Sequence, residues 1–171
     1  MIGNAMREVR SCGIVVCSTR SATGVREDKT GPIIAEWARS QGYQVLGPAV
    51  VPDGDPTEAA IKEFLAEDCA VIITTGGTGF SSDDVTPEIT SQLIDRPAPG
   101  IAEEIRRRGL ANTPMAPLTR GVAGVAGKTF IVNLAGSTGA VRDGLEVLDD
   151  LLIHIVDQIE DLHNNTHKES S

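Results

Sequence analysis

Aromatic residues are scarce in this chain of 171 residues, which has one Trp, one Tyr and three Phe. So few aromatics cannot form the stacking platform on which single-stranded nucleic acids bind. Basic residues are also in the minority, because 15 Lys and Arg face 24 Asp and Glu and give a formal net charge of −9. A field of this sign repels nucleic acids and anionic membranes, so we expect neither as a partner.

Cysteines and long apolar runs are few as well. Cys12, Cys17 and Cys69 form no C-x-x-C pair, and their odd number fits a reducing compartment without a disulfide framework. We expect them to be buried and unreactive. No run approaches the roughly 18 apolar residues of a membrane span, and the first residues do not form a signal peptide. A hydrophobic content of 40% still allows a folded core, so we expect a cytoplasmic globular protein.

Short apolar runs alternate with amphipathic ones along the chain, and this alternation predicts strands followed by helices. It is typical of a three-layer α/β/α fold with a mostly parallel, Rossmann-like sheet. We expect a single domain over residues 12–162, an N-terminal extension over 1–11 and a disordered tail over 163–171. The predicted strands are 13–18, 43–51, 70–75 and 128–136, and the predicted helices are 32–41, 56–68 with Asp55 as cap, one from Thr86, 99–109 and 137–162.

The stretch ITTGGTGFSSDDVTPEIT, residues 73–90, follows a predicted strand. Its glycines let the backbone turn sharply and approach a ligand closely, and the helix that begins at Thr86-Pro87 directs free N–H groups toward the same place. Ligands of parallel sheets bind at the carboxyl ends of strands. We therefore favour a phosphate-binding loop over a β–α turn that needs glycine for geometry alone. The loop residues concerned are Thr75, Gly76, Gly77, Thr78 and Gly79.

Two aspartates, Asp83 and Asp84, lie close to this loop, where a bare carboxylate would repel phosphate. Either could simply be solvated, and Asp84 also suits the N-terminus of the following helix. A bridging Mg²⁺ would instead give a carboxylate a use, because Mg²⁺ binds one or two carboxylates together with phosphate oxygens. Asp53 in VVPDGD leaves a neighbouring strand and is the candidate second ligand.

Other motifs carry less weight. In NLAGSTGA, residues 133–140, Ser137 or Thr138 predicts a helix cap, which by itself is more often structural than ligand-binding. VAGVAGKT, residues 122–129, resembles a Walker A loop but feeds a strand instead of a helix, so we interpret it as a turn. The histidines at 154, 163 and 167 show no metal-ligand spacing, and we expect no zinc site.

Taken together, TTGGTGFSSDDVTPEIT, VVPDGD, KTGP and NLAGS resemble the MogA/MoaB molybdopterin-binding family of molybdenum cofactor biosynthesis, including its gephyrin-like fused relatives, over residues 12–160. The resemblance implies a homotrimer that binds molybdopterin and, in the MogA branch, transfers AMP from Mg-ATP to its terminal phosphate. It implies that Asp53 and Asp84 are the catalytic, Mg²⁺-binding aspartates. It further implies binding positions at Ser18, Thr75, Gly76, Gly77, Thr78, Gly79, Thr86, Pro87, Glu88, Asn133, Gly136 and Ser137.

The sequence departs from the family pattern at two positions, with Thr19 where many relatives carry Asp and Ala135 where many carry Pro. Two other functions stay open. A chain of the MoaB branch could hold molybdopterin as a carrier without adenylylating it. A nucleotide hydrolase is the other alternative, although such relatives usually carry an additional domain.

Overall fold

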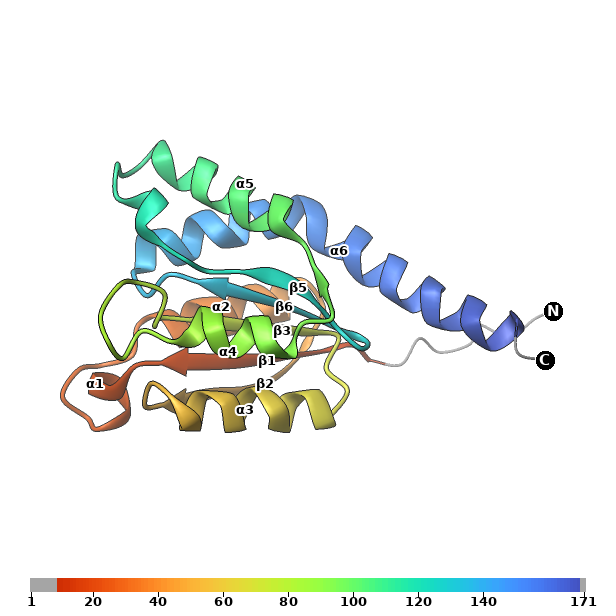
Figure 1. Ribbon diagram of the computed structural model, residues 1–171, viewed down its shortest axis with the longest axis horizontal. Coiled ribbons are helices and arrows are strands. Elements are labelled where there is room, and N and C mark those ends of the chain that lie inside the picture. The colour runs from red at the N-terminus through yellow and green to blue at the C-terminus, as the bar shows by residue number, and fades with distance from the viewer. Residues whose placement is uncertain (1–8, 170–171) are drawn as a thin grey trace.

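The computed structural model describes residues 9–169, with side chains described for residues 9–161. A mixed sheet of six strands lies between two layers of helices, which confirms the predicted three-layer α/β/α class (Figure 1). The elements in chain order are β1 (Ser11–Cys17), α1 (Thr19–Ala22), α2 (Thr30–Ser40), β2 (Gln44–Val51), α3 (Asp55–Ala66), β3 (Val71–Thr75), α4 (Thr86–Leu93), β4 (Arg96–Pro97), α5 (Pro99–Leu110), the 3-10 helix η1 (Ala116–Leu118), β5 (Ala123–Ala126), β6 (Thr129–Leu134) and α6 (Thr138–Glu169).

The strand order is β2-β1-β3-β6-β5-β4. The first four strands of this order are parallel to one another. At the remaining edge, β5 pairs antiparallel with β6, and β4 pairs antiparallel with β5. The last residues of the parallel strands are in register, because Cys17 pairs with Val51 and Thr75 pairs with Leu134. The loops after these four strands therefore leave the same edge of the sheet, which is where a ligand of this fold class binds.

Alternating side chains on the central strands supply two cores. Ile73 on β3 belongs to the core beneath α2, α5 and α6, while Ile72 belongs to the core beneath α3 and α4. The strand VIITT is buried along its whole length, as expected for a strand covered on both faces. All three cysteines are buried in these cores, as predicted.

The structure differs from the sequence prediction mainly in short or terminal elements. Periodicity did not indicate α1, β4 or β5, which span only two to four residues. The glycine-rich stretch 122–129 joins β5 to β6 as an antiparallel hairpin, which confirms that it is no P-loop. Asp55 is the first residue of α3 and not its cap, whereas α4 begins at Thr86 as predicted.

The final helix, α6, does not stop at the predicted Leu162 but runs to Glu169. No glycine or proline follows Gly144 to end it. Residues 170–171 of the predicted disordered tail lie outside the described residues. Figure 1 shows the last turns of α6 extending past the sheet, away from the strand ends that carry the candidate site. Within the described residues, no helix combines the length and apolar character that would let it cross a membrane.

Candidate functional site

Gly76 is the point at which three strand-end loops touch. Its N–H donates to the carbonyl of Leu134 at 3.0 Å, so this amide is not available to a ligand. The Gly76 φ of +92° is accessible chiefly to glycine, and a Cβ there would lie 2.3 Å from the carbonyl oxygen of Cys17. A Cβ on Gly136 would in turn lie 3.3 Å from the Cα of Gly76. The loops after β1, β3 and β6 are therefore packed backbone against backbone.

Asp53 lies next to this contact, at the end of β2. Its Oδ2 accepts hydrogen bonds from the Thr19 hydroxyl at 3.1 Å and from the Thr19 N–H at 3.3 Å. Its Oδ1 is buried and has no hydrogen-bond partner among the described residues. The same Oδ1 lies 3.0 Å from where a Cβ on Gly77 would be, so the glycine leaves it room. Thr19, the first departure from the family pattern, thus orients the carboxylate.

Burial raises the pKa of Asp53, and the two hydrogen bonds from Thr19 only partly oppose that effect. The nearby charges of Asp83 and Asp84 also raise the pKa of Asp53. The structure therefore brings together the aspartates that the sequence separates by about thirty positions. A half-buried carboxylate among like charges, with one orphan oxygen, is an environment that a cation would relieve.

Asp84 closes a turn with Ser81 beside residues 75–79, which we call the glycine loop. Its Oδ2 accepts from the Ser81 N–H at 3.0 Å, and its own N–H donates back to the Ser81 carbonyl at 3.0 Å. A Cβ on Gly79 would lie 2.8 Å from Asp84 Oδ2. Among the side chains that are described, no cluster of three or more His, Cys, Asp or Glu could hold a metal alone. Asp53 and Asp84 are the carboxylates that could hold Mg²⁺, with phosphate oxygens and water as its remaining ligands.

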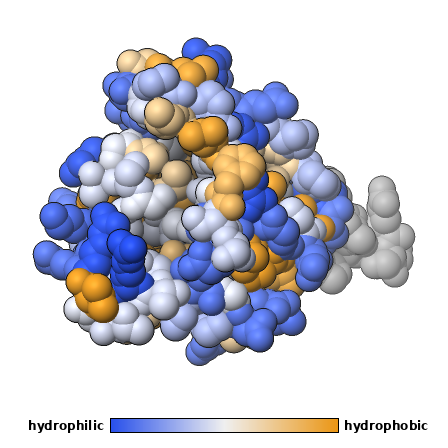
Figure 2. All heavy atoms as spheres, turned by 60° about the vertical axis from the view of Figure 1, so that its left-hand side comes forward, coloured by the Kyte–Doolittle hydropathy of each residue, from blue (hydrophilic) through white to orange (hydrophobic). Residues whose placement is uncertain are grey.

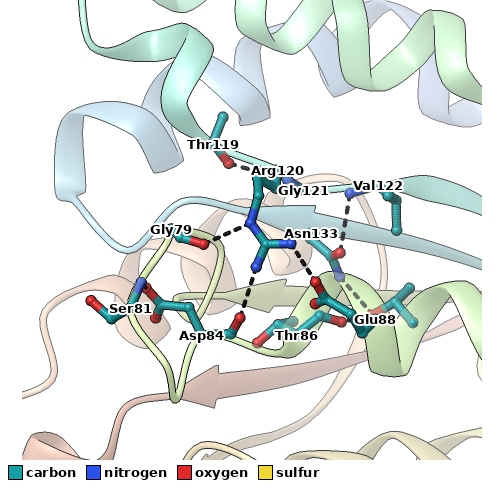
Figure 3. A network of polar contacts seen from close by, with 11 residues as sticks. Gly79, Ser81, Asp84, Thr86, Glu88, Thr119, Arg120, Gly121, Val122 and Asn133 are labelled. Carbon is teal, nitrogen blue, oxygen red and sulfur yellow. Dashed lines mark hydrogen bonds and ion pairs between the residues drawn. The ribbon is translucent and has the colours of Figure 1, made fainter.

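Arg120 fixes the loop that carries Asp84 (Figure 3). Its guanidinium donates to the carbonyl of Gly79 at 2.7 Å and to the carbonyl of Asp84 at 2.8 Å, and it pairs with Glu88. The hydrogen bond from Arg120 holds the pKa of Glu88 below its usual range. Sequence reasoning missed Arg120, which lies far along the chain from its partners and belongs to no local motif. Glu88, a predicted binding residue, faces this arginine.

The hydroxyls of Thr75 and Thr78, two residues of the predicted phosphate-binding loop, are engaged within the protein. Thr75 donates to the carbonyl of Ala135 at 3.1 Å, and the Thr78 hydroxyl accepts from Thr119 at 3.1 Å. These bonds tie the loop after β3 to the neighbouring loops. The backbone N–H groups of Gly77, Thr78 and Gly79 have no acceptor in the described part of the chain, so these amides can take a phosphate oxygen.

Asn133, another predicted binding residue, is buried with its amide fully used. Its Nδ2 donates to the hydroxyls of Thr74 and Thr90, both at 2.9 Å, and its Oδ1 accepts from the Val122 N–H at 3.1 Å. Thr86 and Pro87 are buried as well, and the Thr86 N–H donates to the carbonyl of Gly77 at 3.2 Å. These buried contacts support the glycine loop from the interior of the protein.

Two cavities flank the loop that follows β6. The apolar cavity, about 380 Å³, lies between α5, η1 and the start of α6, and its lining includes Ala102, Ile105, Gly109, Met115, Ala116, Leu118 and Asp143. The polar cavity, about 370 Å³, lies beside the start of α2, and its lining includes Ser18, Arg26, Glu27, Asp28, Lys29, Thr30, Thr75 and Gly76. Gly136 and Ser137 line both cavities.

Three predicted residues fall where these cavities adjoin the loops. The Ser18 hydroxyl accepts from the Ser21 N–H at 3.2 Å and caps the N-terminus of α1. The Ser137 hydroxyl accepts from the Ala140 N–H at 3.1 Å, which confirms the predicted cap of α6. Gly136 stands between the two cavities. The surface at this end is largely hydrophilic, with hydrophobic groups in separate spots (Figure 2).

Comparisons with known proteins cover the same part of the chain. A family described as a probable molybdopterin binding domain matches residues 13–154, a range that contains both aspartates and all the loops above. The molybdenum cofactor synthesis protein cinnamon of Drosophila melanogaster is 35% identical over 163 residues, which cover 92% of this chain and 27% of that protein. The molybdopterin adenylyltransferase of Haemophilus influenzae is 34% identical over 149 residues, which cover 85% of this chain and 76% of that protein.

Among solved structures, the molybdopterin biosynthesis Mog protein of Mycobacterium ulcerans is 50% identical and superposes with a TM-score of 0.85. The superposition covers 88% of this chain and 99% of that one. The chain described here thus matches the Mycobacterium protein over nearly its full length, but spans only about a quarter of the Drosophila relative.

Proposed function

Because the chain belongs to the molybdopterin-binding family of molybdenum cofactor biosynthesis, we propose that it is a molybdopterin adenylyltransferase, which transfers AMP from ATP to the terminal phosphate of molybdopterin. The observation that carries this proposal is the meeting of two cavities at Gly136 and Ser137. Two different ligands that fill these cavities would approach each other beside the glycine loop. A cytoplasmic homotrimer, implied by the sequence resemblance, is part of the same proposal.

The two cavities suit two different substrates. The flat pterin would enter the apolar cavity, where Ile105 and Leu118 can cover its faces. The triphosphate of ATP would enter the polar cavity, toward the cationic side chains of Arg26 and Lys29. Both phosphate groups would then lie near the free N–H groups of Gly77 to Gly79, and this arrangement brings the reacting atoms together.

In the reaction, an oxygen of the molybdopterin phosphate attacks the α-phosphorus of ATP. The new P–O bond forms as the bond to the bridging oxygen of pyrophosphate breaks, and pyrophosphate leaves with that electron pair. The protein holds the two anions in line, with Asp53 and Asp84 positioned to hold Mg²⁺, which when bound neutralises phosphate charge. Cys17, at the end of β1, is no nucleophile because burial raises the pKa of its thiol to about 11.

A pterin carrier would use the apolar cavity alone, and its function does not explain Asp53. A buried carboxylate oxygen without a hydrogen-bond partner lowers the stability of the fold. Binding of a pterin by a carrier would not require such an oxygen. A metal that is needed during phosphate chemistry does give that oxygen a use. This orphan oxygen therefore favours the enzyme over the carrier.

A transfer assay with ATP labelled at the α-phosphate tests the proposal. We expect Asp84→Ala to lower adenylyl transfer by roughly 100-fold or more, because aligned electrostatic contacts of this kind contribute about that much, while molybdopterin still binds. The neighbouring Asp83→Ala is the matched control and should keep most of the activity, since Asp83 is exposed. Unchanged transfer in Asp84→Ala would show that the metal-site assignment is wrong. Tight molybdopterin binding without any product from the wild-type protein would support the carrier.

A further inference from the structure

A buried carboxylate faces the apolar cavity. Asp143 lies on α6 and is only 8% exposed, yet it lines this cavity among mainly aliphatic side chains. Its Oδ2 lies 3.9 Å from where a Cβ on Gly109 of α5 would be, so the absence of a side chain at Gly109 keeps the space beside the carboxylate open. Aspartates are rarely buried to this extent unless they are paired.

Asp143 has little of the pairing that burial demands. Asn112 donates to its Oδ1 at 2.7 Å, and this is the carboxylate's only hydrogen-bond partner in the part of the chain whose side chains are described. Arg106 lines the same cavity but donates to the carbonyls of Thr119 at 3.3 Å and Gly121 at 3.0 Å, and it forms no ion pair with Asp143. One carboxylate oxygen is thus left facing the cavity.

A carboxylate only accepts hydrogen bonds, so it selects a ligand edge that only donates. The 2-amino group and adjacent ring N–H of a 2-amino-4-oxopyrimidine form such an edge, and the pterin of molybdopterin carries it. We infer that Asp143, held by Asn112, is the specificity-determining residue that pairs with this pterin edge at the end of the apolar cavity. The inference rests on the proposed function.

The same chemistry excludes adenine from this position. The amino group of adenine adjoins a ring nitrogen that is an acceptor, and that lone pair would face the carboxylate oxygen. The nucleotide is therefore directed to the polar cavity. Guanine presents the same donor edge as pterin. An experiment must therefore distinguish a guanine ligand from a pterin ligand.

Competition binding tests the inference on the wild-type protein. Molybdopterin is bound first and is then displaced with pterin, with lumazine, whose 2-position carries an oxo group in place of the amino group, or with GMP. We expect pterin to compete at least 10-fold better than lumazine, because a hydrogen bond to a charged group contributes about 1.5–3 kcal/mol. Equal competition by lumazine would overturn the inference, and so would displacement by GMP at lower concentration than by pterin.

The variant Asp143→Asn keeps the shape of the side chain but replaces one acceptor with a donor. We expect it to raise the Kd of molybdopterin roughly 10- to 100-fold, to abolish the preference for pterin over lumazine and to leave the Kd of ATP unchanged. Glu146→Gln is the matched control, because Glu146 lies on the same helix but is exposed and pairs with Arg108. Both variants should retain cooperative thermal unfolding.

The two proposals fail in different ways. If Asp143→Asn binds molybdopterin as tightly as the wild-type protein, Asp143 only ties the turn after α5 to α6 through Asn112 and the inference is wrong, while the adenylyl transfer proposal stands. If the pterin preference is present but no AMP is transferred, the adenylyltransferase proposal is wrong and the recognition of the pterin edge stands.

Discussion

Asp53 and Arg120 both lie beside the glycine loop, but their side chains are used in different ways. Asp53 keeps one buried oxygen without a partner in the described chain, which leaves capacity for a ligand. Arg120 is fully engaged, because its guanidinium serves two backbone carbonyls and Glu88 (Figure 3). The first residue is therefore suited to chemistry, and the second to holding the loop in the conformation that chemistry requires.

The pairing of Arg120 with Glu88 predicts a pH-dependent stability. Arg120 lowers the pKa of Glu88 in the folded protein, so the pair stabilises the fold above the pKa of Glu in the unfolded chain, and this contribution is lost as pH falls through the lowered value. We expect Glu88→Gln to lower Tm at pH 7 by roughly 1–3 °C, because a largely exposed pair contributes about 1 kcal/mol or less.

Thermal unfolding between pH 7 and pH 3 measures this effect, and the two Tm values should converge at the acidic end. Glu63→Gln on the exposed side of α3 provides the comparison, since Glu63 has no ion-pair partner among the described residues. A gap between wild type and Glu88→Gln that stays constant down to pH 3 would show that the pair with Arg120 is not its cause.

These residues also show what the sequence could predict about the site. The glycine loop and Asp84 share one short stretch, so their proximity follows from local sequence alone. Asp53 was predictable because strand ends of a parallel sheet meet at one edge. Arg120 contacts Gly79 across 41 positions and Asn112 contacts Asp143 across 31, and no local pattern encodes such pairs. For the same reason, the sequence did not predict that the Asn133 amide forms its hydrogen bonds within the protein.

The parallel strands were predictable as elements because their β-branched runs are long enough to show a pattern, as in VIITT. Two-residue β4 and four-residue α1 carry no period, and only tertiary contacts define them. The close packing of the loops after β1, β3 and β6 was likewise not predictable. It depends on the register of the strands, which places Gly76 against the carbonyl of Cys17.

This packing predicts opposite results for two glycine substitutions. Gly76→Ala should destabilise the fold by about 2–5 kcal/mol, because a positive φ costs an L residue about 1–2 kcal/mol and the overpacking adds about 1–3 kcal/mol. Gly139→Ala should be neutral or stabilise by up to about 1 kcal/mol, because Gly139 lies in the first turn of α6 with open space around it. Urea unfolding of both variants measures the difference. Equal stability of the two would contradict the loop packing described here.

The whole molecule is acidic, and yet the proposed substrates are anions. Attraction must therefore be local, through the free amides of Gly77 to Gly79, the cations of the polar cavity and a metal at Asp53 and Asp84. The formal charge of −9 acts at longer range and opposes the approach of these substrates. Binding strength and association rate are thus set by different parts of the molecule.

This opposition predicts an unusual salt dependence. We expect the association rate constant of Mg-ATP to rise a few-fold between ionic strengths of about 0.01 and 0.15 M, because the Debye length falls from about 30 to about 8 Å and screens the net charge. Stopped-flow binding measures the rate, and adenosine, which is uncharged, should show little change. A rate that falls with salt would mean that Arg26 and Lys29 outweigh both the net charge and the neighbouring Glu27 and Asp28 of the polar cavity.

The burial of the three cysteines has a practical consequence. All three lie within the described residues, and burial raises the pKa of Cys12 to about 12 and that of Cys17 to about 11. Thiol-directed dyes react with accessible thiolates, so the native chain offers them poor targets. A cysteine introduced at Phe80, which is 73% exposed beside the glycine loop, would carry the dye alone. A single dye at this position would therefore report on the surroundings of the glycine loop, without signal from the native cysteines.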